Sequence, residues 1–422
     1  MVPMREALYV PEYPTLYPGM LLARGVASDF PPFDSGNVHW FYFARNAVWN
    51  AVKMLGLEGR EVLVPSYHHG VEIEALIHAG AKPVFYRVGR NWDVDLAEVA
   101  ARIGPDTGAL YLVHYAGFPG PVREFKSLAE KHGLPLIEDC ALSLLSSDRQ
   151  LKLGTIGDIG IFCLYKSLPV PNGGALQVNG SQHYDMPRLQ PPPATSVFNH
   201  AASSLLKNME LRGGRAGRWS RSLLRSVARV AVRASQVERI ATGTMHFDPG
   251  HVNLGISPLS LRIARAQDFV DIVALRRRNY LVLLSQIETV CRPLFETLPD
   301  GVCPLFYPLR VKRKDEVLYR LRSVGIEAID FWRSHHPACD PQEFPETMEL
   351  RRSIIEIPCH QDIGTETMWR IAAFVRQAIV EIEHAATPGV SRRSISSKKM
   401  ALKNLRAVTL NRKQRQGECT PR

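Results

Sequence analysis

The stretch from residue 134 to residue 178 constrains this chain most, because it contains three short apolar runs that meet charged residues or glycines. The first run, residues 134–137, leads into two carboxylates, Glu138 and Asp139. The second, residues 158–164, is followed by Lys166, and the third, residues 173–178, begins with a glycine pair. Such runs are typical of buried strands in a parallel sheet, with functional side chains at the strand ends.

An acid at one strand end and a lysine after another form the pair that pyridoxal phosphate (PLP) requires. The lysine binds the cofactor as a Schiff base, and the carboxylate keeps the pyridine nitrogen protonated so that the ring can accept electrons. Asp139 is also typical of a helix cap, and Lys166 of a solvated loop residue. These two residues alone therefore leave both interpretations open.

Alternating strand and helix patterns precede this stretch. Strands are expected at residues 61–67, 82–88 and 109–115, and helices at 44–57, 71–80 and 125–133, with a further helix after the capping residue Asp95. This alternation predicts a parallel α/β sheet. Because active sites in such sheets lie beyond the carboxyl ends of the strands, we expect residues 67–69, Asp139 and Lys166 at one rim.

Four segments carry a resemblance to a known family: VHYAGFPG (113–120), GLPLIEDCA (133–141), GTIGDIGIFCLYKSL (154–168) and NGGALQVN (172–179). In this order they resemble the DegT/StrS family of PLP-dependent sugar aminotransferases, from about residue 41 to about residue 383. The resemblance implies an α/β protein of the aspartate-aminotransferase-like fold. Its large domain would have a mostly parallel seven-stranded sheet, followed by a small C-terminal α+β domain.

The resemblance also implies an activity. The protein would move an amino group from an amino acid, with glutamate as the expected donor, to a keto-sugar, expected to be nucleotide-linked, in surface-polysaccharide or secondary-metabolite biosynthesis. Lys166 would bind PLP and later act as the base, and Asp139 would hold the ring nitrogen protonated. A family branch that dehydrates sugars carries histidine in place of the lysine, so Lys166 argues against that reaction.

Further cofactor contacts follow from the same resemblance. Arg45 and Asn46 match the turn that holds the cofactor phosphate, and Cys163 matches a phosphate contact, with a buried structural thiol as the alternative. His69 matches the residue that stacks on the pyridine ring, with residues 67 and 68 as rivals. Asn253 matches an asparagine that reaches the partner subunit's phosphate, which implies a homodimer. His335, His336, His360 and Gln361 lie near a loop where relatives bind substrate.

Two features depart from the family pattern. Leu142 stands where relatives carry a glutamine, and the segment before Lys166 is two residues shorter than usual. The turn at residues 44–46 is also altered. The missing glutamine and the altered turn support one alternative function, a non-catalytic or regulatory protein with the PLP fold, whereas the shorter segment fits a family branch with a shortened loop.

The expected organisation has four parts. They are an N-terminal arm (1–38), a large PLP-binding domain (39–250) with a basic helical insertion at about 199–240, a small domain (251–385) and a basic disordered tail (386–422). The net charge of +11 is concentrated in the insertion and the tail, which leaves a mildly acidic body. That distribution argues against a nucleic-acid enzyme.

The insertion contains a candidate membrane contact at residues 218–233. Four arginines recur every fourth residue and would share one helix face, opposite aliphatic side chains: Arg221, Arg225, Arg229 and Arg233. A basic amphipathic helix of this kind can bind an anionic membrane surface, and the alternative is a helix packed on the body.

Cysteine usage and hydropathy indicate the compartment. Seven cysteines are scattered without a CxxC pair, which predicts neither a disulfide framework nor a metal site. The N-terminus carries charges and prolines where a signal peptide would be apolar, and no apolar run is long enough to span a membrane. A cytoplasmic protein is therefore expected.

Overall fold

A seven-stranded sheet forms the centre of the computed structural model. The structure describes residues 8–23, 28–182, 184–235 and 247–382; at residues 215–216 and 218–235 it describes the backbone alone. The strand order is β1-β9-β8-β5-β4-β2-β3. Strands β3, β2, β4, β5 and β8 are parallel, whereas β9 and then β1 join antiparallel. The predicted mostly parallel sheet is confirmed. Its strands are β1 (Val38–Phe41), β2 (Glu61–Pro65), β3 (Lys82–Tyr86), β4 (Thr107–Val113), β5 (Leu136–Cys140), β8 (Ile159–Cys163) and β9 (Gly174–Val178).

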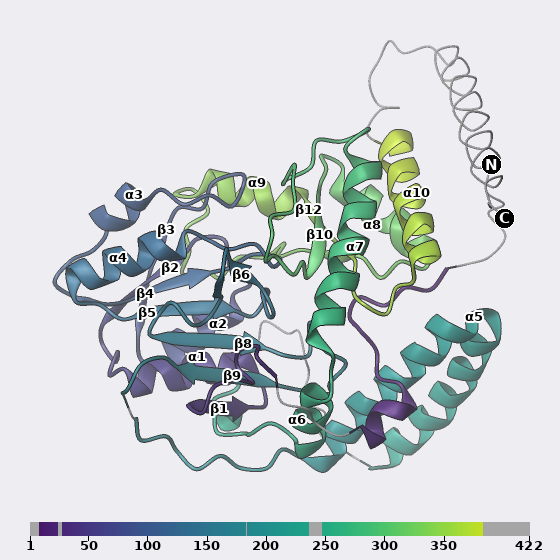
Figure 1. The fold of residues 1–422 in the computed structure, drawn as a ribbon, viewed down its shortest axis with the longest axis horizontal. Coiled ribbons are helices and arrows are strands. Elements are labelled where there is room, and N and C mark those ends of the chain that lie inside the picture. Colours follow the sequence, from purple (N-terminus) through teal and green to yellow (C-terminus); the bar gives the residue numbers. More distant parts are fainter. Residues whose placement is uncertain (1–7, 24–27, 183, 236–246, 383–422) are drawn as a thin grey trace, which may run out of the picture.

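Helices connect the parallel strands, as Figure 1 shows. Helix α1 packs on β8 and β9, and α4 packs on β4 and β5. Their ends follow local chemistry: the Asp95 side chain accepts from the Ala97 amide at the start of α3, and Gly133 adopts φ +65° after α4. These helices are α1 (Ala44–Met54), α2 (Val71–His78), α3 (Leu96–Ala101) and α4 (Val122–His132).

A second sheet has three antiparallel strands in the order β10-β12-β11. Helix α7 packs along α10 and also contacts β10, and Figure 1 shows α7 and α10 side by side. A domain boundary near residue 250 stays a prediction. This part contains α7 (Phe269–Ile287), β10 (Phe306–Arg310), α8 (Lys314–Ser323), β11 (Ile329–Asp330), α9 (Pro345–Ser353), β12 (Ile354–Pro358) and α10 (Thr365–Ile382). Shorter elements are η1 (Pro18–Leu22), β6 (Ser147–Asp148), β7 (Leu151–Lys152), η2 (Pro249–His251) and α6 (Pro258–Arg265).

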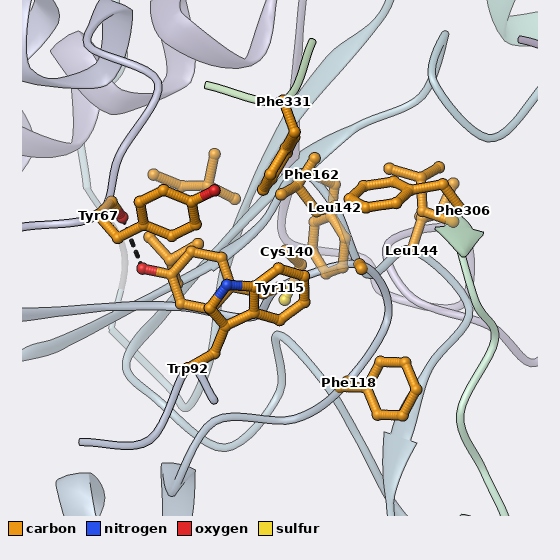
Figure 2. Close-up of a cluster of buried hydrophobic side chains, with 14 of the residues drawn as sticks. Tyr67, Trp92, Tyr115, Phe118, Cys140, Leu142, Leu144, Phe162, Phe306 and Phe331 are labelled. Atoms are coloured by element: carbon orange, nitrogen blue, oxygen red, sulfur yellow. Dashed lines mark hydrogen bonds between the residues drawn. The ribbon is translucent and has the colours of Figure 1, made fainter. Parts of the chain in front are cut away.

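An aromatic cluster joins the two sheets (Figure 2). Tyr67 and Tyr115 follow strands of the large sheet, and the Tyr115 hydroxyl donates to the Tyr67 carbonyl at 2.6 Å. Phe331 follows β11 in the small sheet, and its ring lies 5.7 Å from that of Tyr67. Leu142 belongs to the same cluster. The family glutamine is therefore replaced here by an apolar side chain that packs in the core between the sheets.

The N-terminal arm is held by parts of the chain that are distant in sequence. Val10 forms a β-bridge with Ile326. The Thr15 amide and hydroxyl both donate to Asp362, at 2.6 and 2.8 Å, and the Asn208 side-chain amide donates to the Thr15 hydroxyl at 2.9 Å. The arm therefore runs between the C-terminal part and the helix that carries Asn208.

That helix, α5 (Ala194–Ser235), is the expected insertion. Figure 1 shows two helical arms projecting from the body, and the kink between them lies at Gly214 (φ 52°, ψ −124°). The side chains of the four arginines, Arg221, Arg225, Arg229 and Arg233, lie outside the described part, as does the tail from residue 383. Among the described residues, no helix combines the length and apolarity that crossing a membrane requires.

Candidate active site

A cavity of about 330 Å³ opens beyond the carboxyl ends of β5 and β8, beside the start of α1. Five of the seven predicted site residues line it: Arg45, His69, Asp139, Cys163 and Lys166. Their gathering at this rim agrees with the strand-end rule for parallel sheets. Asn46 and Asn253 are not part of the lining.

Asp139 and Glu138 are neighbours on β5 with different surroundings, because successive side chains of a strand point to opposite faces. The Asp139 carboxylate accepts from the Tyr111 hydroxyl at 2.6 Å and from the Ala141 amide at 2.8 Å. Burial, and then the negative charge of Glu72, raise the pKa of Asp139. A cation in the cavity would therefore favour its ionised form.

Glu138 has a structural role. Its buried carboxylate accepts from the amides of Gly154 at 2.9 Å and Ile156 at 2.7 Å, and also from the Gly157 amide. The His114 ring lies 3.2 Å away. These partners tie β5 to the turn before β8 and leave Asp139 as the carboxylate that faces the cavity.

Lys166 lies on the segment between β8 and β9, and its side chain is half-buried. Its ammonium group has no hydrogen bond or ion pair with any residue that the structure describes. Its positive charge nevertheless shifts the pKa values of Asp139, His69 and Cys163. The amine is therefore close to the other cavity residues and available to a ligand.

His69 is the residue of the 67–69 group that reaches the cavity. Burial, and then the charges of Lys166 and Arg45, lower its pKa to about 3, so the ring is neutral. Its Nδ1 atom is buried without a partner among the described residues. His68 is buried against the Pro65 carbonyl, and Tyr67 packs in the aromatic cluster, so neither rival lines the cavity.

The start of α1 supplies backbone donors, because no side chain caps the helix at Phe43. The Arg45 guanidinium lies 4.1 Å from the centre of the Phe43 ring, and burial lowers its pKa. Asn46 points elsewhere: its side-chain amide donates to the His251 carbonyl at 2.7 Å. At Gly174 a Cβ atom would lie 2.4 Å from the Ala44 nitrogen, so only glycine allows β9 to approach this turn.

Cys163 and Asn253 complete the predicted set. Cys163 ends β8 and is buried, and burial raises the pKa of its thiol, which is therefore protonated. The Asn253 carbonyl accepts from the Gln190 amide at 2.8 Å, whereas its side-chain oxygen is buried without a partner among the described residues. An unpaired buried oxygen of this kind is expected to have a partner in the functional protein.

Several lining residues were not predicted. Tyr13 comes from the N-terminal arm, and Trp332, Arg333 and Glu356 come from the region of the small sheet. A glutamate inside the apolar strand at residues 354–358 was the available sequence signal for Glu356. The four candidates near the substrate loop, His335, His336, His360 and Gln361, do not line the cavity.

The fold is that of PLP-dependent sugar aminotransferases. The PLP form of the putative sugar aminotransferase Spr1654 from Streptococcus pneumoniae is 14% identical, with a TM-score of 0.63, over 88% of this chain and 99% of that one. PseC from Helicobacter pylori, an aminotransferase of pseudaminic acid biosynthesis, is 16% identical with a TM-score of 0.62, over 89% and 100% of the two chains. These likenesses confirm the predicted fold.

Residues 44–192 match the DegT/DnrJ/EryC1/StrS aminotransferase family, in agreement with the resemblance seen in the sequence. A GDP-perosamine synthase from Vibrio cholerae is 31% identical over 134 residues, which is 31% of this chain and 36% of the relative. UDP-N-acetyl-3-dehydro-alpha-D-glucosamine 3-aminotransferase from Acidithiobacillus ferrooxidans is 38% identical over 110 residues, 26% and 30% of the two chains. The chain thus matches about a third of the length of these relatives.

Proposed function

We propose that this protein is a PLP-dependent aminotransferase that moves an amino group from an amino acid, with glutamate as the expected donor, to a nucleotide-linked keto-sugar. The observation that carries the proposal is one cavity lined by both Asp139 and Lys166. The names of the relatives, which include GDP- and UDP-sugar aminotransferases, support the nucleotide-sugar class. Surface-polysaccharide or secondary-metabolite biosynthesis is the proposed context.

The residues of the cavity fit PLP. The Asp139 carboxylate is held by two donors and still favours a nearby cation, which a protonated ring nitrogen would supply. Uncapped amides at the start of α1 suit a phosphate, and Arg45 adds a positive charge there. The neutral His69 ring would stack on the cofactor without adding a second cation beside Lys166.

Each residue would have a defined task. Bound PLP would supply the electron sink that amino-group transfer needs. Lys166 would hold the cofactor through Nζ and, when its amine is free, would move a proton at the substrate carbon. Asp139 would keep a proton on the ring nitrogen, and the aromatic cluster beside Leu142 would exclude water from one side. Cys163, as a protonated thiol, would donate a weak hydrogen bond near the phosphate.

The enzyme is favoured over the non-catalytic alternative because Asp139 and Lys166 line one cavity and because the matching family and relatives are named as aminotransferases. Leu142 also lines this cavity, so the position of the family glutamine offers an apolar surface there. Beyond the activity, we propose a homodimer in which Asn253 serves the neighbouring subunit's site. The scattered cysteines favour the cytoplasm. The arginine spacing at residues 218–233 fits either a helix packed on the body or peripheral contact with a membrane, and vesicle binding distinguishes the two.

The decisive experiment traps the cofactor. Purified protein incubated with PLP should absorb visible light, and borohydride should fix the cofactor irreversibly to Lys166, as peptide mapping would show. Label on another lysine, or none, would remove the assignment. The variant Lys152→Ala should still be labelled on Lys166, because Lys152 pairs with Asp34 away from the cavity.

A further inference from the structure

Glu356 is a buried carboxyl that the proposed chemistry does not yet use. It lies on β12, the central strand of the small sheet, where its neighbours Ile355 and Ile357 are fully buried in the core. Glu356 lines the cavity instead and is 8% exposed. Within the part of the chain that the structure describes, its carboxyl oxygens have neither a hydrogen bond nor an ion pair.

A buried carboxyl without a partner is costly, so such groups normally meet a hydrogen-bonding partner. Burial raises the pKa of Glu356 to about 8, although the charge of Lys166 opposes this. The carboxyl therefore keeps its proton near neutral pH and can both donate and accept a hydrogen bond. A hydroxyl group, which also donates and accepts, is its natural partner.

Tyr13 lines the same cavity from the N-terminal arm. Burial, and then the charge of Glu356, raise the pKa of Tyr13, so the phenol keeps its proton and remains a hydrogen-bond donor. The Tyr13 ring meets Tyr165 edge-on at 6.5 Å. Trp332 adds an apolar surface to the lining.

We propose that Glu356 and Tyr13 form the wall that recognises the sugar, with the Glu356 carboxyl bonded to a hydroxyl group of the keto-sugar. This inference rests on the proposed function and specifies its acceptor side. A glutamate donor carries no hydroxyl group, whereas a sugar offers several hydroxyl groups that a neutral carboxyl and a phenol can bond. Arg333 does not favour the donor either, since Asp330 and Asp315 already pair with it.

The test separates the two substrates. PLP-loaded wild type, Glu356→Leu, Glu356→Gln and the control Glu366→Leu, an exposed position on α10, are compared in two measurements. The first is the half-reaction with glutamate, followed by the cofactor's absorbance. The second is calorimetric binding of a panel of UDP-, GDP- and dTDP-linked keto-sugars, which needs no turnover.

We expect Glu356→Leu to weaken binding of the best sugar by about 5- to 100-fold, while the glutamate half-reaction and PLP loading stay unchanged. Glu356→Gln, which still donates and accepts, should recover most of the affinity, and Glu366→Leu should match wild type. The inference is overturned if Glu356→Leu binds the sugar normally, if it slows the glutamate half-reaction equally, or if wild type binds no sugar of the panel. A wild type that binds sugar but gives no half-reaction with glutamate or other amino acids would instead contradict the proposed function.

Discussion

Asp139 is the residue on which the proposed electron sink depends. Asp139→Asn removes the charge but keeps the size of the side chain. Its Oδ1 can still accept from the Ala141 amide, whereas its Nδ2 would donate to the Tyr111 hydroxyl, which reverses that bond. We expect PLP to remain bound while amino transfer slows by about a hundredfold or more, since a neutral ring nitrogen accepts electrons poorly. Steady-state kinetics beside Asp148→Asn, whose carboxylate pairs with Arg123 outside the cavity, would measure this. Near-normal turnover would show that Asp139 is structural.

Glu356 should also make the stability of the folded protein depend on pH. Its pKa rises from an ordinary 4.5 to about 8 on folding, so between these values the unfolded chain releases the proton that the folded protein keeps. Stability therefore falls as pH rises through this window. Glu356→Gln cannot ionise and should escape this loss, so its Tm relative to wild type should increase by about 2 °C or more between about pH 5 and about pH 8.

Thermal unfolding of both proteins across this pH range is the measurement, with Glu366→Gln as an exposed control. The neighbouring charges of Lys166, Glu12 and Lys314 act on the same carboxyl, so ionic strength should be held constant. A Tm difference that stays the same at all pH values would contradict a buried, protonated Glu356.

The sequence predicts Lys166 and Asp139 because short, local motifs surround them. It does not decide which of residues 67–69 stacks on the cofactor, since the ring that reaches the cavity is selected by packing against the small sheet. Tyr13 and Glu356 lie at opposite ends of the chain, and only the folded arm brings them together. Asn46 shows the converse: its position matches the family turn, but its side chain bonds to the His251 carbonyl.

At the scale of elements, the contact between β9 and α1 should control phosphate binding. In Gly174→Ala, the new Cβ would lie 2.3 Å from the Phe43 carbonyl carbon, so the strand and the helix start must separate. We expect a lower Tm and PLP affinity weakened by about tenfold or more, since the α1 amides would shift. Gly104→Ala meets nothing within 4 Å and is the matched control. Equal PLP titrations for both variants would contradict this role.

Most helices and strands are predictable because their apolar periods and caps are local, as at Asp95 and Gly133. The antiparallel pairing of β9 with β8 and of β1 with β9 is not predictable, because a short apolar run does not tell whether a strand pairs parallel or antiparallel. The kink of α5 lies at the second residue of the glycine pair 213–214, where the backbone freedom of glycine allows the non-helical φ and ψ of Gly214.

At the scale of the whole molecule, subunit mixing can test the dimer. In a dimer of one Lys166→Ala and one Asn253→Ala subunit, one site would combine the intact Lys166 with the partner's intact Asn253. Each variant alone should be nearly inactive, whereas random mixing should restore about a quarter of wild-type activity, because half the dimers are mixed and each has one complete site. No recovery after verified subunit exchange would mean that Asn253 acts within its own subunit.

The arginines of α5 make a second prediction at this scale. If their face meets anionic lipid, wild type should sediment with phosphatidylserine vesicles at low salt and less at high salt, since each arginine contributes about 1 kcal/mol near the surface. Changing Arg221, Arg225, Arg229 and Arg233 together to glutamine should abolish sedimentation and leave solution activity intact. Wild type that stays in the supernatant at low salt would rule out the membrane contact.

The N-terminal arm has a consequence for biosynthesis on the ribosome. Tyr13 reaches the cavity on an arm whose contacts include Ile326 and Asp362, which are translated much later. The large sheet can assemble while synthesis continues, since domains generally fold as units in N-terminal order. The wall that recognises the sugar cannot assemble at that stage, because the positions of Tyr13 and Glu356 both depend on the last part of the chain. A nascent chain should therefore acquire a cofactor site before it acquires a complete substrate site.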